Sequence, residues 1–182
     1  MPQKPKILAT QVVASSELFC IETVDLRFSN GEERRFERLA GGYNGAVLVV
    51  PLLNDDTVLL IKEYCVGMED YEYYLPKGKV DAGEAMLAAA NRELKEEVGY
   101  GARQLHELVA ISQAPAYMRH RTHLVIARDL YEEKLQGDEP EPLEVLPLPL
   151  AELENWVMNG KITEARSIAA LYLTRAWLDK QR

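Results

Sequence analysis

The chain has 182 residues, 47% of them hydrophobic and 27% charged, which is typical of one globular domain with a sizeable core. The formal net charge of −8 leaves no dense Lys/Arg stripe, which argues against a protein that grips a nucleic-acid backbone. The longest apolar run, residues 46–53, is too short to span a bilayer, and the N-terminus lacks the apolar core of a signal peptide. We therefore expect a cytoplasmic protein without a nucleic-acid or membrane partner, in which Cys20 and Cys65 are free thiols.

The first third of the chain is rich in strand signals. Strands are predicted at residues 7–14, 19–28, 32–39, 45–53 and 57–64. Asn30-Gly31 lies between the second and third of these and accepts the positive φ of a tight turn, so the two strands are predicted to form a β-hairpin. The last two strands carry nearly continuous apolar runs, which indicates burial on both faces.

A loop and a helix follow these strands. Residues 73–84 are punctuated by proline and glycine, and this pattern predicts a loop. Asp81 and Glu84 have the spacing of a capping box, so Asp81 is the predicted N-cap of a helix over about residues 82–98. Gly99 is the predicted terminator of that helix.

The second half of the chain mixes strands and helices. Further strands are predicted at residues 105–112 and 122–130, and further helices at residues 150–160 and 163–180. Residues 132–144 are acidic and proline-rich without periodicity, which predicts a loop. Because strands and helices interleave without strict βαβ order, we expect a mixed sheet between helices.

The predicted helix at 82–98 concentrates negative charge on one side. Glu93, Glu96 and Glu97 lie three and four residues apart, and like charges at this spacing repel each other. On a helical wheel they border the apolar stripe formed by Leu87, Ala90, Leu94 and Val98. A solvated charged face is the ordinary explanation of such a cluster. The position at the core edge, directly after a Pro/Gly loop, instead favours a site for a hard divalent cation, with Glu93 and Glu97 as two ligands.

These residues match a family signature. Gly78, five residues, Glu84, seven residues and then R-E-L-K-E-E-V-G-Y at 92–100 resemble the Nudix box, G-x5-E-x7-R-E-U-x-E-E-x-G-U, where U is bulky and aliphatic. Only Tyr100 departs from the pattern. Nearly the whole chain resembles the ADP-ribose pyrophosphatase branch of the Nudix hydrolases, and within it the bacterial ADP compounds hydrolases of the NudE type.

The resemblance implies a fold and a domain division. The expected fold is α/β, a Nudix α/β/α sandwich with a mixed central sheet plus an N-terminal antiparallel β-hairpin subdomain. The N-terminal β subdomain is expected at residues 1–42, where it serves as the dimer or swap element of a homodimer. The Nudix hydrolase domain is expected at residues 43–182, with the catalytic helix at about 82–98.

The resemblance also implies an activity. It is metal-dependent hydrolysis of the diphosphate bond in ADP-ribose, NADH and short diadenosine polyphosphates, which releases AMP, with Mg²⁺ or Mn²⁺ as cofactor. Cys65 replaces an arginine common in ADP-ribose pyrophosphatases, and Lys77 replaces the alanine of their L-P-A-G segment. Both departures favour a broad range of ADP compounds. The alternatives are a nucleotide-sugar or longer polyphosphate hydrolase, and a non-catalytic nucleotide sensor.

The resemblance assigns roles to the residues of the box. Glu93 and Glu97 are the principal expected metal ligands, completed by Glu96 and the carbonyl of Lys77. Arg92 is expected to orient the carboxylates and Glu84 to support the loop and helix through an ion pair with Arg92. Gly78 and Gly99 are expected to be structural.

Two further assignments lie outside the box. The base that activates water is expected in the segment Asp138-Glu139-Pro140-Glu141 of the loop predicted at 132–144, where Glu139 is the first candidate and Glu141 the second. Arg34 and Arg35 match a strand whose arginine grips the substrate, often across a dimer interface. Because neighbouring strand residues point to opposite faces, only one of the two arginines is expected to serve. A solvated loop and surface arginines remain the alternatives.

Overall fold

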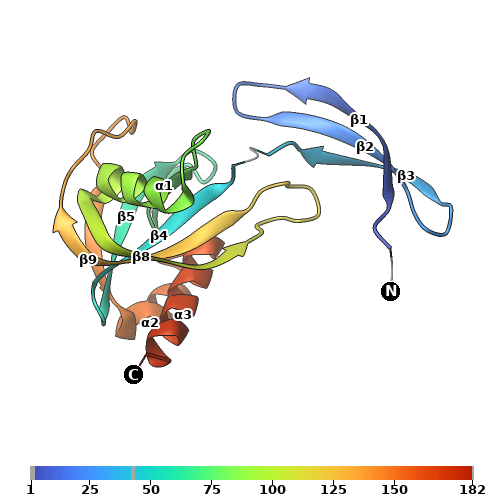
Figure 1. Ribbon diagram of the computed structural model, residues 1–182. Helices are drawn as coiled ribbons and strands as arrows, with labels where there is room; N and C mark the ends of the chain where they lie inside the picture. The colour runs from blue at the N-terminus through green and yellow to red at the C-terminus, as the bar shows by residue number, and fades with distance from the viewer. Residues whose placement is uncertain (1–2, 42–43, 182) are drawn as a thin grey trace. The chain divides into compact units, whose positions relative to one another are not determined.

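The computed structural model describes residues 3–41 and 44–181, which form two compact units (Figure 1). One unit comprises Met1–Gly45 and Ser112–Arg121, and the other comprises Ala46–Ile111 and Thr122–Arg182. The expected domain boundary between residues 42 and 43 lies outside the described residues. None of the helices in the described ranges is long and apolar enough to cross a membrane.

The first unit is built on a three-stranded antiparallel sheet. Its strands are β1 (Lys6–Ser15), β2 (Cys20–Arg27) and β3 (Glu33–Leu39), in the order β1-β2-β3. The turn between β2 and β3 has the predicted chemistry, because Gly31 has a φ of 88° and Asn30 Oδ1 accepts the Glu32 N–H at 3.1 Å. The N-terminal subdomain is therefore a three-stranded sheet that contains the expected hairpin.

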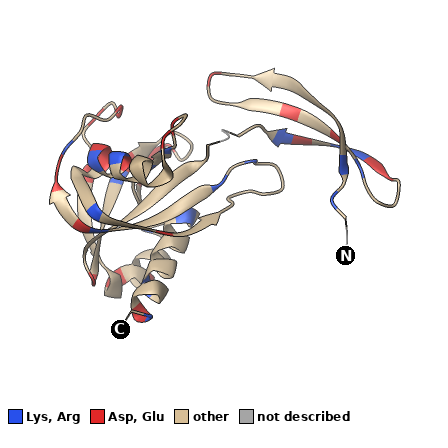
Figure 2. Cartoon of the chain, in the orientation of Figure 1, with Lys and Arg blue, Asp and Glu red and all other residues tan. Residues whose placement is uncertain are grey.

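The two faces of this N-terminal sheet differ in polarity. Register and alternation place one set of mostly apolar side chains together, which we call the apolar face: Ile7, Val12, Val24, Leu26 and Phe36. Ile7, Val12 and Phe36 are exposed. The other face carries polar residues such as Asp25 and Arg35, and Figure 2 shows acidic and basic residues close together along β3. The sheet is thus amphipathic, and its own unit leaves most of the apolar face exposed.

The second unit contains a seven-stranded mixed sheet. Its strands are β4 (Ala46–Asn54), β5 (Thr57–Cys65), β6 (Asp70–Tyr74), β7 (Lys77–Lys79), β8 (Tyr100–Ile111), β9 (Thr122–Glu132) and β10 (Glu144–Pro149). The main path runs β10-β5-β4-β9-β8, while β6 pairs with β5 and β7 with β4. Only β4 and β9 pair in parallel among these strands, and the other pairs are antiparallel. The expected mixed sheet is confirmed.

Helices cover both faces of this sheet (Figure 1). Helix α1 (Met86–Glu93) runs directly into a π-helical turn, Leu94–Val98, on one face. The other face carries α2 (Leu153–Met158), which follows a 3₁₀ turn at Leu150–Glu152, and α3 (Ala165–Asp179). Alternate residues of β4 enter the two cores, with Leu48 packed toward α3 and Val47 toward α1. This is the expected α/β/α sandwich.

Several local expectations were wrong. Strands β6, β7 and β10 lie in stretches that were predicted as loop or left unassigned. Asp81 is not the N-cap, because α1 begins after Ala85. The Asp81 N–H donates to Glu84 Oε2 and the Glu84 N–H donates to the Asp81 backbone carbonyl, each at 3.1 Å, so this pair closes a turn before the helix and the Asp81 side chain caps nothing. Leu87, expected in the buried stripe, is exposed.

Candidate active site

The carboxylates of the predicted cation site lie where α1 passes into the π-helical turn. Glu93 is the last residue of α1, and Glu96 and Glu97 belong to the turn that Gly99 ends with a φ of 82°. Leu94 and Val98 pack into the core on the same segment, which fixes the rotation of the turn. Glu93 and Glu97 are consequently buried, with exposed fractions of 9% and 6%. Buried carboxylates are rare unless they are paired or bind a metal.

Arg92 holds three glutamates together. Its Nε and Nη2 donate to the two Glu84 carboxylate oxygens at 3.0 and 3.1 Å, and Nη1 donates to Glu93 Oε1 at 2.7 Å and to Glu96 Oε2 at 3.0 Å. Nη2 also donates to the Lys79 carbonyl at 3.0 Å. The predicted ion pair between Glu84 and Arg92 is present. The guanidinium therefore fixes the loop before α1 to the carboxylates at its end.

Gly78 and Lys77 complete the border of this cluster. A Cβ atom at Gly78 would lie 2.0 Å from the carboxylate carbon of Glu93, so the Glu93 carboxylate occupies space that only glycine leaves open. The backbone N–H of Lys77 donates to Glu97 Oε2 at 2.8 Å. Both residues lie on β7, which pairs with β4, so the buried sheet sets their positions. The glycine of the box is required by close packing against Glu93.

The surroundings shift the acidity of these groups. Burial raises the pKa of Glu97 to about 8, although the positive charge of Lys77 opposes the shift. Burial also raises the pKa of Glu93 above its ordinary value, against the bond from Arg92. The side-chain bond from Arg92 lowers the pKa of Glu84. Without a cation the fold therefore disfavours the negative charge of its two buried glutamates.

Two open pockets adjoin the carboxylates. One, of about 500 Å³, is bordered by β7 and the α1 segment, including Lys77, Arg92, Glu93 and Glu97. The other, of about 470 Å³, lies beneath residues 133–143, which we call the acidic loop. Glu97 lines both pockets. A substrate in either pocket would thus meet this carboxylate.

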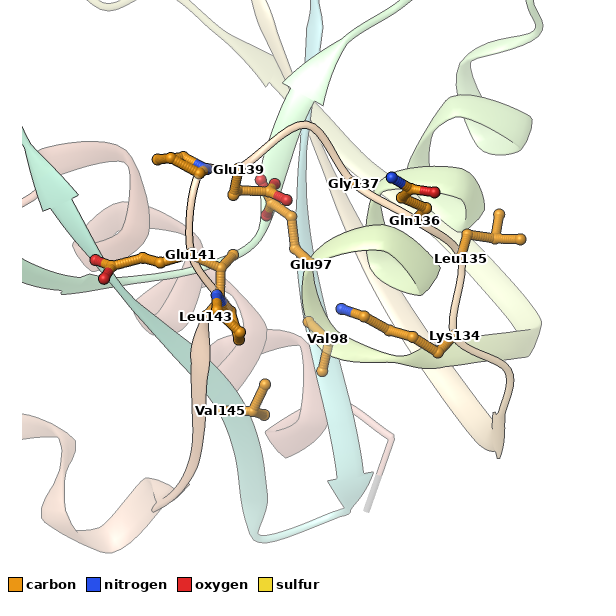
Figure 3. A pocket seen from close by; sticks show the side chains of 12 residues that line it. Glu97, Val98, Lys134, Leu135, Gln136, Gly137, Glu139, Glu141, Leu143 and Val145 are labelled. Atoms are coloured by element: carbon orange, nitrogen blue, oxygen red, sulfur yellow. The ribbon is translucent and has the colours of Figure 1, made fainter.

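The acidic loop distinguishes its two candidate bases. Figure 3 shows the Glu139 carboxylate beside that of Glu97, whereas Glu141 points away from Glu97. The Tyr71 hydroxyl donates to Glu141 Oε1 at 2.5 Å. At its start the loop is fixed to the π-helical turn, because the Leu135 N–H donates to the Lys95 carbonyl at 3.1 Å. Glu139 therefore lies against the carboxylate cluster and Glu141 against β6.

The cluster has the donor set that a hard cation requires. Among the described residues, no three His, Cys, Asp or Glu side chains already converge as a complete set of ligands. Glu93 Oε1 accepts from Arg92 and Glu97 Oε2 accepts from Lys77, while the second oxygen of each has no hydrogen-bond donor within the described chain. These oxygens, at the edge of a pocket open to water and phosphate, fit a divalent cation with incomplete protein coordination.

Comparison with known proteins identifies the family. The NUDIX domain model matches residues 42–170, and the model of the NudE-type Nudix hydrolase N-terminal domain matches residues 5–38. The chain belongs to the Nudix hydrolase family. The family expected from the box is confirmed, and the chain is a pyrophosphohydrolase. Nudix hydrolases generally depend on divalent metal ions.

Several relatives match this Nudix hydrolase over most of its length. "ADP compounds hydrolase NudE" of Escherichia coli (strain K12) is 49% identical over 98% of this chain and 96% of its own length. "ADP-ribose pyrophosphatase" of Bacillus subtilis (strain 168) is 27% identical over 91% of this chain and 90% of its own length. A crystal structure of an ADP compounds hydrolase superposes with a TM-score of 0.91 at 49% identity and covers 98% of this chain and 96% of its own.

The two arginines predicted to bind substrate lie on β3 of the N-terminal unit. Arg35 makes a bidentate pair with Asp25, at 2.7 and 2.9 Å, across the polar face of the sheet. Arg34 pairs with Leu26 in the register, so it lies on the apolar face, and its Nη1 is 2.9 Å from Glu32. Arg35 thus engages Asp25 through two N–H donors, Nε and Nη2, whereas Arg34 contacts Glu32 and the Glu33 carbonyl through Nη1 alone.

Sequence reasoning missed some residues that line the Nudix site. Lys79, Gln136 and Asp138 border the pocket at β7, and the Lys79 carbonyl accepts from Arg92. Tyr71 anchors Glu141. Asp138 lies within the segment singled out as acidic, and for Tyr71 only the bond to Glu141 was not predicted. Spacing carried no signal for Lys79 and Gln136, because their places in the pocket arise from contacts between different segments.

Proposed function

We propose that this Nudix hydrolase cleaves the diphosphate bond of ADP-linked compounds. Water adds to one phosphorus atom, the bridging P–O bond breaks, and the products are AMP and a phosphorylated remainder. The substrate class is ADP-ribose, NADH and short diadenosine polyphosphates. The observation that carries the proposal is the pair of buried carboxylates, Glu93 and Glu97, at the edge of a pocket. The names of the Escherichia coli and Bacillus subtilis relatives support the ADP-linked class.

We propose Mg²⁺ or Mn²⁺ as the cofactor, held by Glu93 and Glu97, with Glu96 and the carbonyl of Lys77 completing the site. Such a cation would supply Lewis acidity, since it neutralises charge on phosphate oxygens and lowers the pKa of water. The free oxygens of Glu93 and Glu97 support this assignment. Arg92 keeps the carboxylates in place, because one guanidinium bonds to Glu84, Glu93 and Glu96 together.

We propose Glu139 as the base that accepts a proton from the attacking water. Its carboxylate lies beside Glu97 (Figure 3), at the end of the pocket beneath the acidic loop. A base must reach the proton that it removes, and position is therefore the first requirement. Glu141 bonds to Tyr71 and points away from Glu97, which supports an anchoring role for Glu141 instead.

We propose that the protein is a homodimer in which the N-terminal sheet contributes to assembly. The exposed apolar face formed by Ile7, Val12 and Phe36 supports this assembly, because a monomer rarely leaves so many apolar side chains of one sheet in water. Arg34, on the same face, is the proposed substrate-binding arginine, and Arg35 is the proposed structural partner of Asp25.

We further propose that the protein works in the reducing cytoplasm. Cys20 and Cys65 are both free thiols, which is the ordinary state of cysteine in that compartment. Cell fractionation with detection of the tagged full chain tests this location.

A substrate panel tests the activity. The purified full chain with Mg²⁺ or Mn²⁺ should release AMP from ADP-ribose, NADH and diadenosine polyphosphates, as followed by chromatography and ranked by kcat/KM. Glu97→Gln should lower kcat about a thousandfold and retain the native circular dichroism spectrum, because it removes one cation ligand with nearly unchanged volume. Nucleotide sugars and longer polyphosphates serve as the competing substrate class. Binding of ADP-ribose without any product would instead identify a sensor.

A further inference from the structure

The side chain of Lys77 occupies an unusual place beside the carboxylates. Its Nζ lies 3.6 Å from the centroid of the Tyr74 ring, and only 23% of the side chain is exposed. Tyr74 in turn donates its hydroxyl proton to Glu63 on β5. The ammonium group is therefore held over a buried aromatic face, where its charge also acts on Glu97.

The donors of this ammonium group remain available. The closest carboxylate oxygen, Glu63 Oε2, is 3.9 Å from Nζ, and no hydrogen bond joins Nζ to another residue within the described ranges. A structural ion pair in the same unit is tighter, since Lys95 Nζ lies 2.9 Å from Glu133. Lys77 thus places a largely buried positive charge at the site, and its three N–H donors form no hydrogen bond with the described residues.

The other cations beside the pocket of about 500 Å³ differ from Lys77. Arg92 uses its donors on Glu84, Glu93, Glu96 and the Lys79 carbonyl. Lys79 lines the same pocket but its side chain is exposed to water, which weakens and disperses its field. Among the described residues that line this pocket, Lys77 is the cation that is both fixed by burial and free to donate.

We propose that the ammonium group of Lys77 binds a phosphate oxygen of the substrate diphosphate. The inference rests on the proposed function, because it assigns a ligand within the same site. A diphosphate between the carboxylate-bound cation and Lys77 would have negative charge neutralised from two sides. Since each N–H of an ammonium can bond to an anionic oxygen, the side chain selects substrates by their phosphate charge. Lys77 is then a substrate-binding residue through its side chain, separate from its backbone N–H bond to Glu97.

Lys77→Met tests the contact, since it removes the charge while it keeps most of the length and volume. We expect kcat/KM for ADP-ribose to fall about 10- to 100-fold, mainly through KM, because a hydrogen bond to a charged group is lost. The inhibition constant of ADP should rise about tenfold or more, whereas that of adenosine, which has no phosphate, should stay within about twofold.

Lys62→Met is the matched control. Lys62 also lies over tyrosine rings, at 5.4 Å from Tyr73 and 5.6 Å from Tyr71, and its Nζ is likewise 3.9 Å from a glutamate, but it lines neither pocket at the carboxylates. We expect its kcat/KM to stay within about twofold of the unsubstituted protein. Equal losses for ADP and adenosine in Lys77→Met, or unchanged inhibition by ADP, would overturn the proposal.

A measurement on the unsubstituted protein covers the case in which Lys77→Met does not fold. Lysine acetylation followed by mass spectrometry should show that Mg²⁺ with ADP slows modification of Lys77 several-fold and leaves Lys62 unchanged. Equal protection of both lysines would contradict the contact. The two proposals fail separately: a full chain that releases no AMP refutes the hydrolase activity, while normal AMP release with ADP inhibition unchanged by Lys77→Met refutes only the contact.

Discussion

Glu97 is a carboxylate that the metal-free fold prefers to keep protonated. Its ordinary pKa of 4.5 is raised to about 8 by burial. Between these two values the folded chain binds the Glu97 proton and the unfolded chain does not, so the free energy of unfolding must fall as the pH rises. The slope from one such group is at most about 1.4 kcal/mol per pH unit. A divalent cation would replace the proton and remove this penalty.

We therefore predict that Glu97→Gln gains stability relative to the unsubstituted protein as the pH rises from about 4.5 to 8 in the presence of EDTA. Urea unfolding of both proteins at several pH values measures the difference between their free energies of unfolding. Groups that titrate in both proteins contribute equally to both values and cancel in this difference. Millimolar Mg²⁺ or Mn²⁺ should stabilise the unsubstituted protein more strongly at the upper end of this range and affect Glu97→Gln little. A difference that does not change with pH would contradict the role of burial.

Gly78 is a second residue whose position makes a sharp prediction. A methyl group there would overlap the Glu93 carboxylate, which Arg92 and the buried α1 segment keep from moving aside. We expect Gly78→Ala to destabilise the protein by about 1–3 kcal/mol and to lower kcat/KM about 100-fold, because it displaces Glu93, the proposed cation ligand.

Gly67→Ala provides the control for Gly78→Ala. A Cβ atom at Gly67 would meet nothing within 4 Å, and its φ is not in the left-handed region. Its stability and kcat/KM should therefore stay close to those of the unsubstituted protein. If Gly78→Ala behaves like Gly67→Ala in thermal unfolding and in the AMP assay, the close packing of Glu93 against β7 does not govern the site.

At the scale of elements, the acidic loop is held at both ends and carries Glu139 between them. The loop is bonded to the π-helical turn through Leu135 and to β6 through Glu141 and Tyr71. We predict that Glu139→Gln lowers kcat about 10²- to 10⁴-fold, because it removes the proposed base. Glu141→Gln keeps a group that can accept from Tyr71 and should lower kcat less than about tenfold.

Tyr71→Phe tests the bond to Glu141 without changing Glu139, the proposed base. It removes the hydroxyl that bonds to Glu141 and leaves Glu139 intact, so kcat should fall far less than in Glu139→Gln. If Glu141→Gln lost more activity than Glu139→Gln, the assignment of the two glutamates would have to be reversed.

The elements that sequence predicted well are those set by local patterns. The hairpin of β4 and β5 was evident because its apolar runs are buried on both faces, and Gly99 ends the catalytic segment because it accepts a positive φ. The resemblance to the Nudix box gave the expected roles of Arg92 and Glu84, and the bonds from Arg92 to Glu84, Glu93 and Glu96 lie within α1, the π-helical turn and the loop before α1. Spacing along the chain is enough to bring such residues together.

The features that sequence missed depend on distant partners. Strand β10 contains two prolines and is defined by its pairing with β5, and β7 has three residues that pair with β4. A helical wheel of regular spacing could not include the π-helical turn that rotates Glu96 and Glu97. The choice between Glu139 and Glu141 was likewise open, because it depends on the bond from Tyr71, 70 residues away in the chain.

At the scale of the whole molecule, we propose that the active site of the homodimer is shared between two chains. Arg34 lies on the uncovered apolar face of the N-terminal sheet, and Glu97 lies in the unit that carries the box. If Arg34 of one copy binds the substrate held by Glu97 of the other, Arg34→Ala and Glu97→Gln damage different parts of a shared site. A mixed dimer of these two variants would then contain one site with both residues intact.

We predict that Arg34→Ala and Glu97→Gln are each poorly active alone and regain activity when mixed, unfolded and refolded together. Random pairing makes half of the dimers mixed, each with one intact site of two, so activity should reach about a quarter of the unsubstituted level. Light scattering of the same samples establishes that they are dimers. Arg35→Ala mixed with Glu97→Gln is the control. Because Arg35 is engaged by Asp25 within its own sheet, this mixture should show the mean activity of its two components and no gain above it. If the Arg34→Ala mixture stays as inactive as its components although dimers form, Arg34 does not act across the interface.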